Sequence, residues 1–208
     1  MESELHLYSK LVIHVQVPVQ QFINCTDEEL KKNNIEVIEK TVGPPGLYSK
    51  GDVYVYPAEL DGLGLTLYEA LACGIPVIGT DIPPINEVVD ENVGRLIKVK
   101  EQKNRPDNYY WPTCVIDENS LYEQMKYFID HKDELPQYKQ RAREKALQEY
   151  DWKSKKDELN QIFASVVRMD HMPAEQLKKE TIQKYHKRIK RYLAMFKMDI
   201  RNLLTLRF

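Results

Sequence analysis

The order strand, glycine-containing turn, helix, strand between residues 52 and 79 constrains the fold more than any other feature. Asp52-Val-Tyr-Val-Tyr-Pro57 is rich in β-branched and aromatic residues and ends at a proline, so it predicts a strand. Residues 65–73 have a helical composition, and Gly74 stands where a glycine commonly follows a helix. Ile75-Pro-Val-Ile-Gly79 is short and continuously apolar, which is typical of a parallel strand that is covered on both faces.

The same alternation extends through the preceding and following segments. Composition predicts further strands over residues 11–17, 35–41 and 95–99. It also predicts a short helix that begins at the N-cap Thr26 and another over residues 85–89. Strands and helices therefore take turns, which indicates an α/β fold: a Rossmann-like, doubly wound parallel sheet with helices on both faces.

The rest of the chain is expected to be a polar loop followed by C-terminal helices. Residues 101–112 have no periodic pattern and predict the loop. Apolar residues at three- and four-residue spacing then predict helices over 119–129, 137–150 and 152–166. The last of these helices carries an apolar face formed by Leu159, Ile162, Phe163 and Val166.

Charge divides the chain into a body and a tail. The 208 residues have a net charge of −2, but residues 168–208 alone hold 11 Lys and Arg against 4 Asp and Glu. We therefore expect one domain over residues 1–167 and a basic amphipathic helical tail over 168–208. The length suits one well-buried domain with an appendage.

The tail is compatible with several partners. Its apolar residues recur at helical spacing between basic ones. Residues 174–208 suit peripheral contact with an anionic membrane, contact with an acidic partner, or packing against an acceptor-binding lobe. A specific nucleic-acid partner is not expected, because the tail has no base-reading motif.

Cysteine usage and the N-terminus indicate an intracellular protein. The chain has three cysteines, an odd number, without C-x-x-C spacing, so neither a disulfide framework nor a zinc site is expected. The acidic N-terminus does not resemble a signal peptide, and no apolar run has the ~18–20 residues of a membrane span. We expect a cytoplasmic location, with peripheral membrane contact as an option.

The turn that precedes the predicted helix at residue 65 is the most informative candidate site. Gly62 and Gly64 let the backbone approach a ligand closely, and a helix N-terminus offers unpaired N–H groups that suit phosphate. Glu69 lies one turn into the helix, where its carboxylate can accept hydrogen bonds from two ribose hydroxyls, and Asp61 can bind further hydroxyls. The alternative is a tight βα turn whose carboxylates are only solvated.

Four segments together resemble the donor-binding half of GT-B glycosyltransferases. They are Asp52–Pro57, Asp61–Leu65, Glu69–Asp81 and Asn86–Val89. The resemblance is to the retaining family called glycosyl transferases group 1 (family 4-like), which includes sucrose synthase-like enzymes and mannosyltransferases. It extends over roughly residues 10–167 and is densest over 52–89. Nucleotide-sugar epimerases and phosphorylases with this fold remain minor alternatives.

The resemblance implies a role for each matching residue. Asp61 stands at the first, catalytic carboxylate, which holds the donor sugar, and Glu69 at the second, which binds the ribose. The donor-binding backbone amides would be those of Leu63 and Gly64 near the sugar, and of Leu65 and Thr66 at the diphosphate. The substrate would be a nucleotide-diphospho sugar, without a cofactor or a metal, and the acceptor a glycan, lipid or protein.

Two departures from the family leave two functions open. Asp61 replaces the usual glutamate, which shortens the side chain by about one C–C bond. The family's Arg/Lys pair and its N-terminal acceptor domain are not recognised, since Lys10 does not match the pair. One hypothesis is a retaining glycosyltransferase that needs an additional acceptor lobe. The other is a truncated, non-catalytic homologue that acts as a binding or scaffold subunit.

Other candidate residues have simpler interpretations. We expect His14 to be a hydrogen-bonded core histidine and Cys73 a small buried residue. The run Tyr109-Tyr-Trp111 either anchors the long loop or stacks on a sugar ring. Pro83 and Pro84 are expected only to stiffen their loop.

Overall fold

The computed structural model describes residues 4–105, 107, 111–166, 179, 182–184 and 186–187. The chain forms two compact units, Met1–Lys156 and Asp157–Phe208. Most of the predicted tail, and Tyr109 and Tyr110 of the predicted loop, lie outside the described residues. The described tail residues 179, 182–184 and 186–187 are helical. The boundary at 167/168 stays a prediction.

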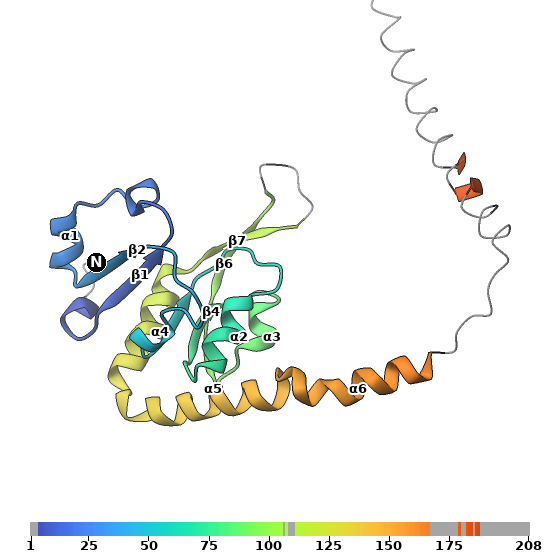
Figure 1. The fold of residues 1–208 in the computed structure, drawn as a ribbon. Coiled ribbons are helices and arrows are strands. Elements are labelled where there is room, and N and C mark those ends of the chain that lie inside the picture. The colour runs from blue at the N-terminus through green and yellow to red at the C-terminus, as the bar shows by residue number, and fades with distance from the viewer. Residues whose placement is uncertain are drawn as a thin grey trace, which may run out of the picture. The chain divides into compact units, whose positions relative to one another are not determined.

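Helices and strands alternate as the sequence predicts (Figure 1). The strands are β1 Leu11–Val15, β2 Ile35–Glu39, β3 Tyr54–Tyr56, β4 Val77–Thr80, β5 Gly94–Ile97, β6 Val99–Lys103 and β7 Thr113–Ile116. The α-helices are α1 Asp27–Lys32, α2 Leu65–Ala72, α3 Ile85–Val88, α4 Glu118–Asp130, α5 Leu135–Glu149 and α6 Trp152–Ser165. The short 3₁₀ helices are η1 Glu4–Leu7, η2 Val19–Gln21, η3 Tyr48–Lys50 and η4 Lys132–Glu134.

The strands form two parallel sheets and one antiparallel hairpin. β1 pairs with β2 in parallel, β3, β4 and β5 form a parallel sheet in that order, and β6 pairs with β7 antiparallel. The predicted α/β class with parallel sheets and helices on both sides is therefore confirmed. Its parallel strands are divided between two sheets rather than joined in one.

The hairpin corrects the prediction of a polar loop over residues 101–112. Glu101 to Lys103 belong to β6 and pair with Thr113 to Val115 of β7. Four of the five β6 residues are exposed, so this strand lacks the apolar alternation that reveals a half-buried strand. Backbone pairing with β7, which side-chain periodicity does not report, holds it in place.

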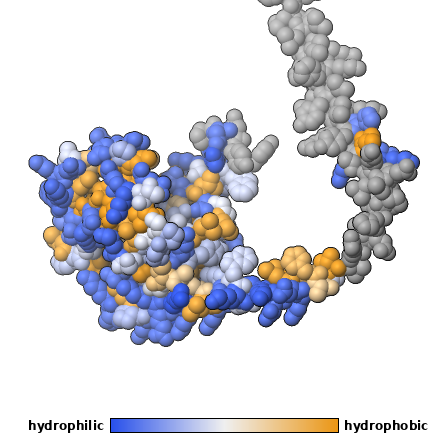
Figure 2. Space-filling model, in the orientation of Figure 1, coloured by the Kyte–Doolittle hydropathy of each residue, from blue (hydrophilic) through white to orange (hydrophobic). Residues whose placement is uncertain are grey.

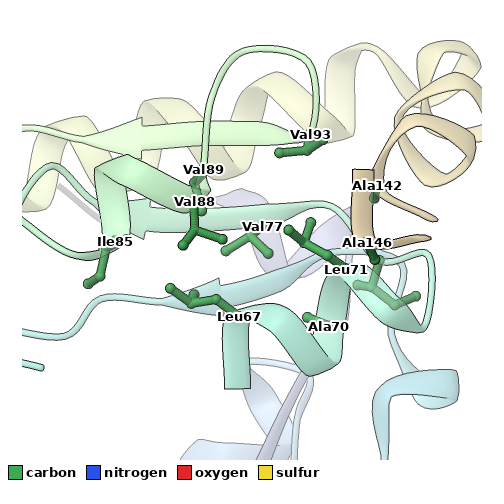
Figure 3. Close-up of a cluster of buried hydrophobic side chains, with 11 residues drawn as sticks. Leu67, Ala70, Leu71, Val77, Ile85, Val88, Val89, Val93, Ala142 and Ala146 are labelled. Carbon is green, nitrogen blue, oxygen red and sulfur yellow. The ribbon is translucent and has the colours of Figure 1, made fainter. Parts of the chain in front are cut away.

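Helices cover both faces of the β3–β4–β5 sheet because neighbouring residues of each strand point to opposite sides. Val77 of β4 packs in one buried cluster with residues of α2, α3 and α5, and Figure 3 shows these side chains gathered around it. The adjacent Ile78 packs on the other side with Phe128 of α4 and Tyr138 of α5. All four residues of β4 are buried, as its apolar sequence predicts.

Several local predictions are confirmed. Thr26 caps α1 in a capping box: its Oγ1 accepts from the Glu29 N–H at 3.2 Å, and its own N–H donates to Glu29 Oε2 at 2.8 Å. Gly74 follows α2 with a φ of +70°. The predicted apolar face is present on α6, which shows exposed apolar side chains along its length (Figure 2). Leu159, Ile162 and Phe163 of α6 are exposed, as is Val166 directly after the helix.

Two predictions of buried residues are wrong. His14 is exposed, since it lies at an outward position of β1, where its Nε2 is 2.7 Å from the carbonyl oxygen of Lys40. Cys73 is exposed because it follows the last residue of α2 and caps the helix rather than facing the sheet.

Gly94, the first residue of β5, is required by the close packing of the sheet. A Cβ at this position would lie 1.9 Å from the Val77 carbonyl oxygen, which belongs to the backbone of β4. We predict that Gly94→Ala lowers the free energy of unfolding by about 3 kcal/mol, at the upper end of the overpacking range. Gly43→Ala is the control, because no atom lies within 4 Å of its added Cβ. Urea unfolding of both variants tests this, and equal stability would contradict the packing.

Candidate functional site

Asp61 organises the turn that connects β3 to α2. Its Oδ1 accepts hydrogen bonds from the N–H groups of Leu63 at 2.8 Å and Gly64 at 2.6 Å. Its Oδ2 accepts from the hydroxyl of Tyr56, the last residue of β3. The Tyr56 hydrogen bond, followed by those from the backbone, holds the pKa of Asp61 below its ordinary value against the opposing effect of burial. Asp61 is therefore an ionised acceptor that ties the turn to the strand.

Gly64 sets the start of α2. Its φ of +68° lies in the left-handed region, and an added Cβ would be 2.7 Å from Leu67 Cδ1, so glycine is needed here. The helix has no side-chain N-cap. No described residue accepts a hydrogen bond from the N–H of Leu65 or Thr66. The first turn of α2 thus presents two open donors at the positive end of the helix dipole.

Glu69 is exposed one turn into α2, and Tyr48 of η3 holds it. The Tyr48 hydroxyl donates to Glu69 Oε2 at 2.8 Å and lies 3.3 Å from the Thr66 carbonyl oxygen. Among the described residues, no second donor to the Glu69 carboxylate is found. The other carboxylate oxygen is therefore open to a ligand.

Three tyrosines, the tyrosine row Tyr48–Tyr54–Tyr56, connect the two carboxylates. The ring of Tyr48 meets that of Tyr54 edge-on at a centroid distance of 5.6 Å, and Tyr54 stacks on Tyr56 at 5.7 Å. Burial, then the hydrogen bond to Asp61, raises the pKa of Tyr56 to about 12. Burial, then the hydrogen bond to Glu69, raises the pKa of Tyr48 as well. Both hydroxyls therefore stay protonated and remain donors at neutral pH.

A cavity of about 420 Å³ adjoins the Asp61 side of the turn. It is lined by the β3–α2 turn, by α3 with the residues just before it, and by the β6–β7 hairpin. Its lining residues are Glu59, Leu60, Asp61, Gly62, Ile82, Pro83, Pro84, Glu87, Gln102, Trp111, Pro112, Thr113 and Cys114. The Glu59 carbonyl oxygen ties the turn to β7 by accepting from the Cys114 N–H at 3.0 Å and from Thr113 Oγ1 at 3.2 Å.

The charged side chains in the described lining of this cavity are all acidic. Three of its lining residues carry carboxylates, Glu59, Asp61 and Glu87, and neither Lys nor Arg is among the described lining residues. Trp111 lines the cavity, whereas Tyr109 and Tyr110 lie outside the described residues. In the part of the chain that is described, no group of three His, Cys, Asp or Glu residues could hold a metal ion.

The site residues predicted from the sequence make different contacts in the structure. Asp61 accepts hydrogen bonds from the N–H groups of Leu63 and Gly64. Leu65 and Thr66 keep open N–H groups, and Glu69 accepts a hydrogen bond from Tyr48. Sequence reasoning missed the tyrosine row. The period-two spacing of Tyr54 and Tyr56 places both on one face of β3, which was an available signal. Nothing in the sequence relates Tyr48 to Glu69, 21 residues away.

Comparisons with known proteins identify the fold. Residues 11–105 match the family model described as Glycosyl transferases group 1. O-antigen chain mannosyltransferase B of Escherichia coli is 38% identical over 47 residues, 23% of this chain and 12% of the relative. The lipopolysaccharide core biosynthesis mannosyltransferase LpsB of Rhizobium meliloti (strain 1021) is 36% identical over 66 residues, 30% of this chain and 19% of the relative.

A solved structure agrees with these matches. The structure of Anabaena HepE in complex with UDP superposes with a TM-score of 0.58 at 15% identity, over 78% of this chain and 43% of HepE. The chain has a GT-B glycosyltransferase fold. Within that class, its family resemblance is to Glycosyl transferases group 1. The chain matches less than half the length of each of these relatives.

None of the helices in the described residues combines the length and the apolar character that crossing a membrane requires.

Removal of the Tyr56 hydroxyl should change the titration of Asp61. In Tyr56→Phe we expect the pKa of Asp61 to rise toward its ordinary value of 3.8, because the leading stabilising contact of the ionised form is lost. Since the native pKa lies below that value, this contact stabilises the fold above pH 3.8, and its contribution disappears as the pH falls through the native pKa. The difference in free energy of unfolding between the native chain and the variant should therefore be largest at neutral pH and disappear in acid.

Carboxyl ¹³C titration by NMR and urea unfolding across this pH range measure the two effects. Tyr54→Phe is the control, since the Tyr54 hydroxyl makes no hydrogen bond to Asp61 in the described structure. An Asp61 pKa that is the same in Tyr56→Phe and in the native chain would contradict the assignment.

Proposed function

We propose that the chain binds a nucleotide-diphospho sugar, the donor of a sugar transfer, at the turn between β3 and α2. The observation that carries the proposal is the pair of open N–H groups of Leu65 and Thr66, one helical turn before the Glu69 carboxylate. The diphosphate binds at these N–H groups and the positive end of α2. Glu69 accepts hydrogen bonds from the hydroxyls of the ribose.

The spacing along α2 supports this orientation. Glu69 lies four positions after Leu65, about 6 Å along the helix axis, and residues four apart lie on the same face. In a nucleotide-diphospho sugar the ribose follows the diphosphate directly, so one ligand can contact both groups. The solved structures of HepE with UDP and with UDP-glucose, which share the fold, agree with a nucleotide-sugar donor.

The donor sugar then lies on the Asp61 side of the diphosphate, toward the cavity. The cavity volume of about 420 Å³ falls in the range of small-molecule pockets, about 300–1,000 Å³. Trp111 offers an aromatic surface to a sugar ring. Asp61 holds the N–H groups of Leu63 and Gly64 in this structure. In the proposed complex Asp61 keeps these bonds and accepts a sugar hydroxyl at a remaining acceptor position of its carboxylate.

We propose that the reaction is a metal-independent hexosyl transfer with retention of configuration to a glycan, lipid or protein. A diphosphate leaving group needs positive charge or dipoles to stabilise it. The described lining of the cavity supplies no Lys or Arg, so we propose that the cations come from protein elements other than this lining, which would also bind the acceptor. A lobe of the same or a partner polypeptide is the proposed source.

The acidic cavity lining, with neither Lys nor Arg among its described residues, also favours a second candidate function. This candidate is a non-catalytic donor-binding or scaffold subunit. A subunit of this kind would bind the nucleotide-diphospho sugar but would neither transfer nor hydrolyse the sugar. Assaying the chain for hydrolysis of a donor that it binds, with and without added acceptor-lobe protein, separates the two candidates.

Glu69→Ala tests donor binding. We expect the thermal stabilisation of the chain by UDP, GDP or ADP to fall to a small fraction of its native value, with at least a tenfold loss of affinity, because the ribose hydroxyls lose their acceptor. Glu123→Ala is the matched control, since this exposed carboxylate lies on α4 and away from the turn. Absence of any nucleotide-dependent shift in the native chain would contradict the proposed function.

A further inference from the structure

We propose that Tyr48 is a positioning residue that orients Glu69 toward the ribose diol, an inference that rests on the proposed donor site. Tyr48 lies in η3, outside the β3–α2 turn, and its hydroxyl contacts Glu69 and the Thr66 carbonyl oxygen of α2. Its 2.8 Å hydrogen bond to Oε2 is the one contact that fixes the Glu69 carboxylate among the described residues. An exposed glutamate without such a contact samples several rotamers, and ordering it on ligand binding costs entropy.

The surroundings of Tyr48 keep its hydroxyl in place. The ring packs edge-on against Tyr54, and the hydroxyl lies between Glu69 Oε2 at 2.8 Å and the Thr66 carbonyl oxygen at 3.3 Å. Both neighbours are acceptors, so the single hydroxyl proton points to the nearer one, the carboxylate. Because the group also remains protonated at neutral pH, it donates to Glu69 constantly.

The hydrogen bond leaves Glu69 able to bind a diol. A carboxylate has about four acceptor positions on its two oxygens, and Tyr48 occupies one. The two adjacent hydroxyls of a ribose can donate to the two oxygens at the same time. A fixed carboxylate plane makes this bidentate contact selective for ribose over deoxyribose, which offers one hydroxyl fewer. Tyr48 thereby contributes to nucleotide affinity and to discrimination between ribose and deoxyribose.

The test is Tyr48→Phe in the full 208-residue chain. The variant removes one oxygen atom and keeps the ring that packs on Tyr54. Affinities are measured by calorimetry for UDP, GDP and ADP and for their 2′-deoxy counterparts. We expect the preferred ribonucleotide to bind about tenfold more weakly, a change of about 1.4 kcal/mol. The 2′-deoxy form should lose less, so the preference for ribose narrows.

Two controls separate positioning from a general structural effect. Tyr54→Phe removes the hydroxyl of the neighbouring ring, which has no hydrogen bond to Glu69 in the described structure, and should keep the native ratio of ribose to deoxyribose affinity. In a Glu69→Ala background, adding Tyr48→Phe should change the affinity no further, because the residue through which Tyr48 acts is gone.

The outcomes distinguish this inference from the proposed function. If Glu69→Ala weakens nucleotide binding while Tyr48→Phe leaves affinity and ribose preference at native values, the role of Tyr48 is overturned and the donor site stands. A loss of equal size for the ribo and deoxy forms, or one that persists in the Glu69→Ala background, also overturns it. If no nucleotide binds the native chain, the donor site and the inference both fail.

Discussion

The hydrogen bonds of the Asp61 carboxylate determine the geometry on which the candidate site depends. One oxygen accepts from Tyr56 at the end of β3, and the other accepts from the N–H groups of Leu63 and Gly64 in the turn. These bonds fold the chain back so that Gly64, in the left-handed conformation, can begin α2 directly. Asp61 thus occupies the N–H groups of Leu63 and Gly64, and the open N–H groups of Leu65 and Thr66 follow directly in the first turn of the helix.

The β3–β4–β5 sheet holds this turn in place. β4 is buried on both faces, so the β3–β4–β5 sheet is held between α2 and α3 on one side and α4 on the other. β3 holds Tyr54 and Tyr56 in the sheet, and ring contacts along the tyrosine row connect them to Tyr48 and so to Glu69. The two carboxylates that the family resemblance singles out are thus positioned by protonated tyrosine hydroxyls. Among the described residues, neither carboxylate forms an ion pair with a lysine or arginine.

Elements with a strong local signal could be predicted from the sequence. The apolar run of β4, the capping residue Thr26 and the glycine turn at α2 each act through neighbouring residues, and the structure places them as expected. The β6–β7 hairpin could not be predicted, since it depends on backbone pairing between exposed strands. The contact of Tyr48 with Glu69 could not be predicted either, because only the tertiary fold brings η3 next to α2. The sequence shows that Asp61 has a shorter side chain than the family's glutamate, but not that this carboxylate accepts hydrogen bonds from the turn.

The proposed donor site depends above all on the open N–H groups of Leu65 and Thr66, which we propose bind the diphosphate. The most direct measurement is a ¹H–¹⁵N NMR titration of the assigned chain with UDP, GDP and ADP, each compared with its free nucleoside. Hydrogen bonding to phosphate should shift the Leu65 and Thr66 resonances with at least one diphosphate, and the nucleoside alone should leave them nearly unchanged. Nucleotide binding that shifts other residues and leaves these two in place would contradict the claim.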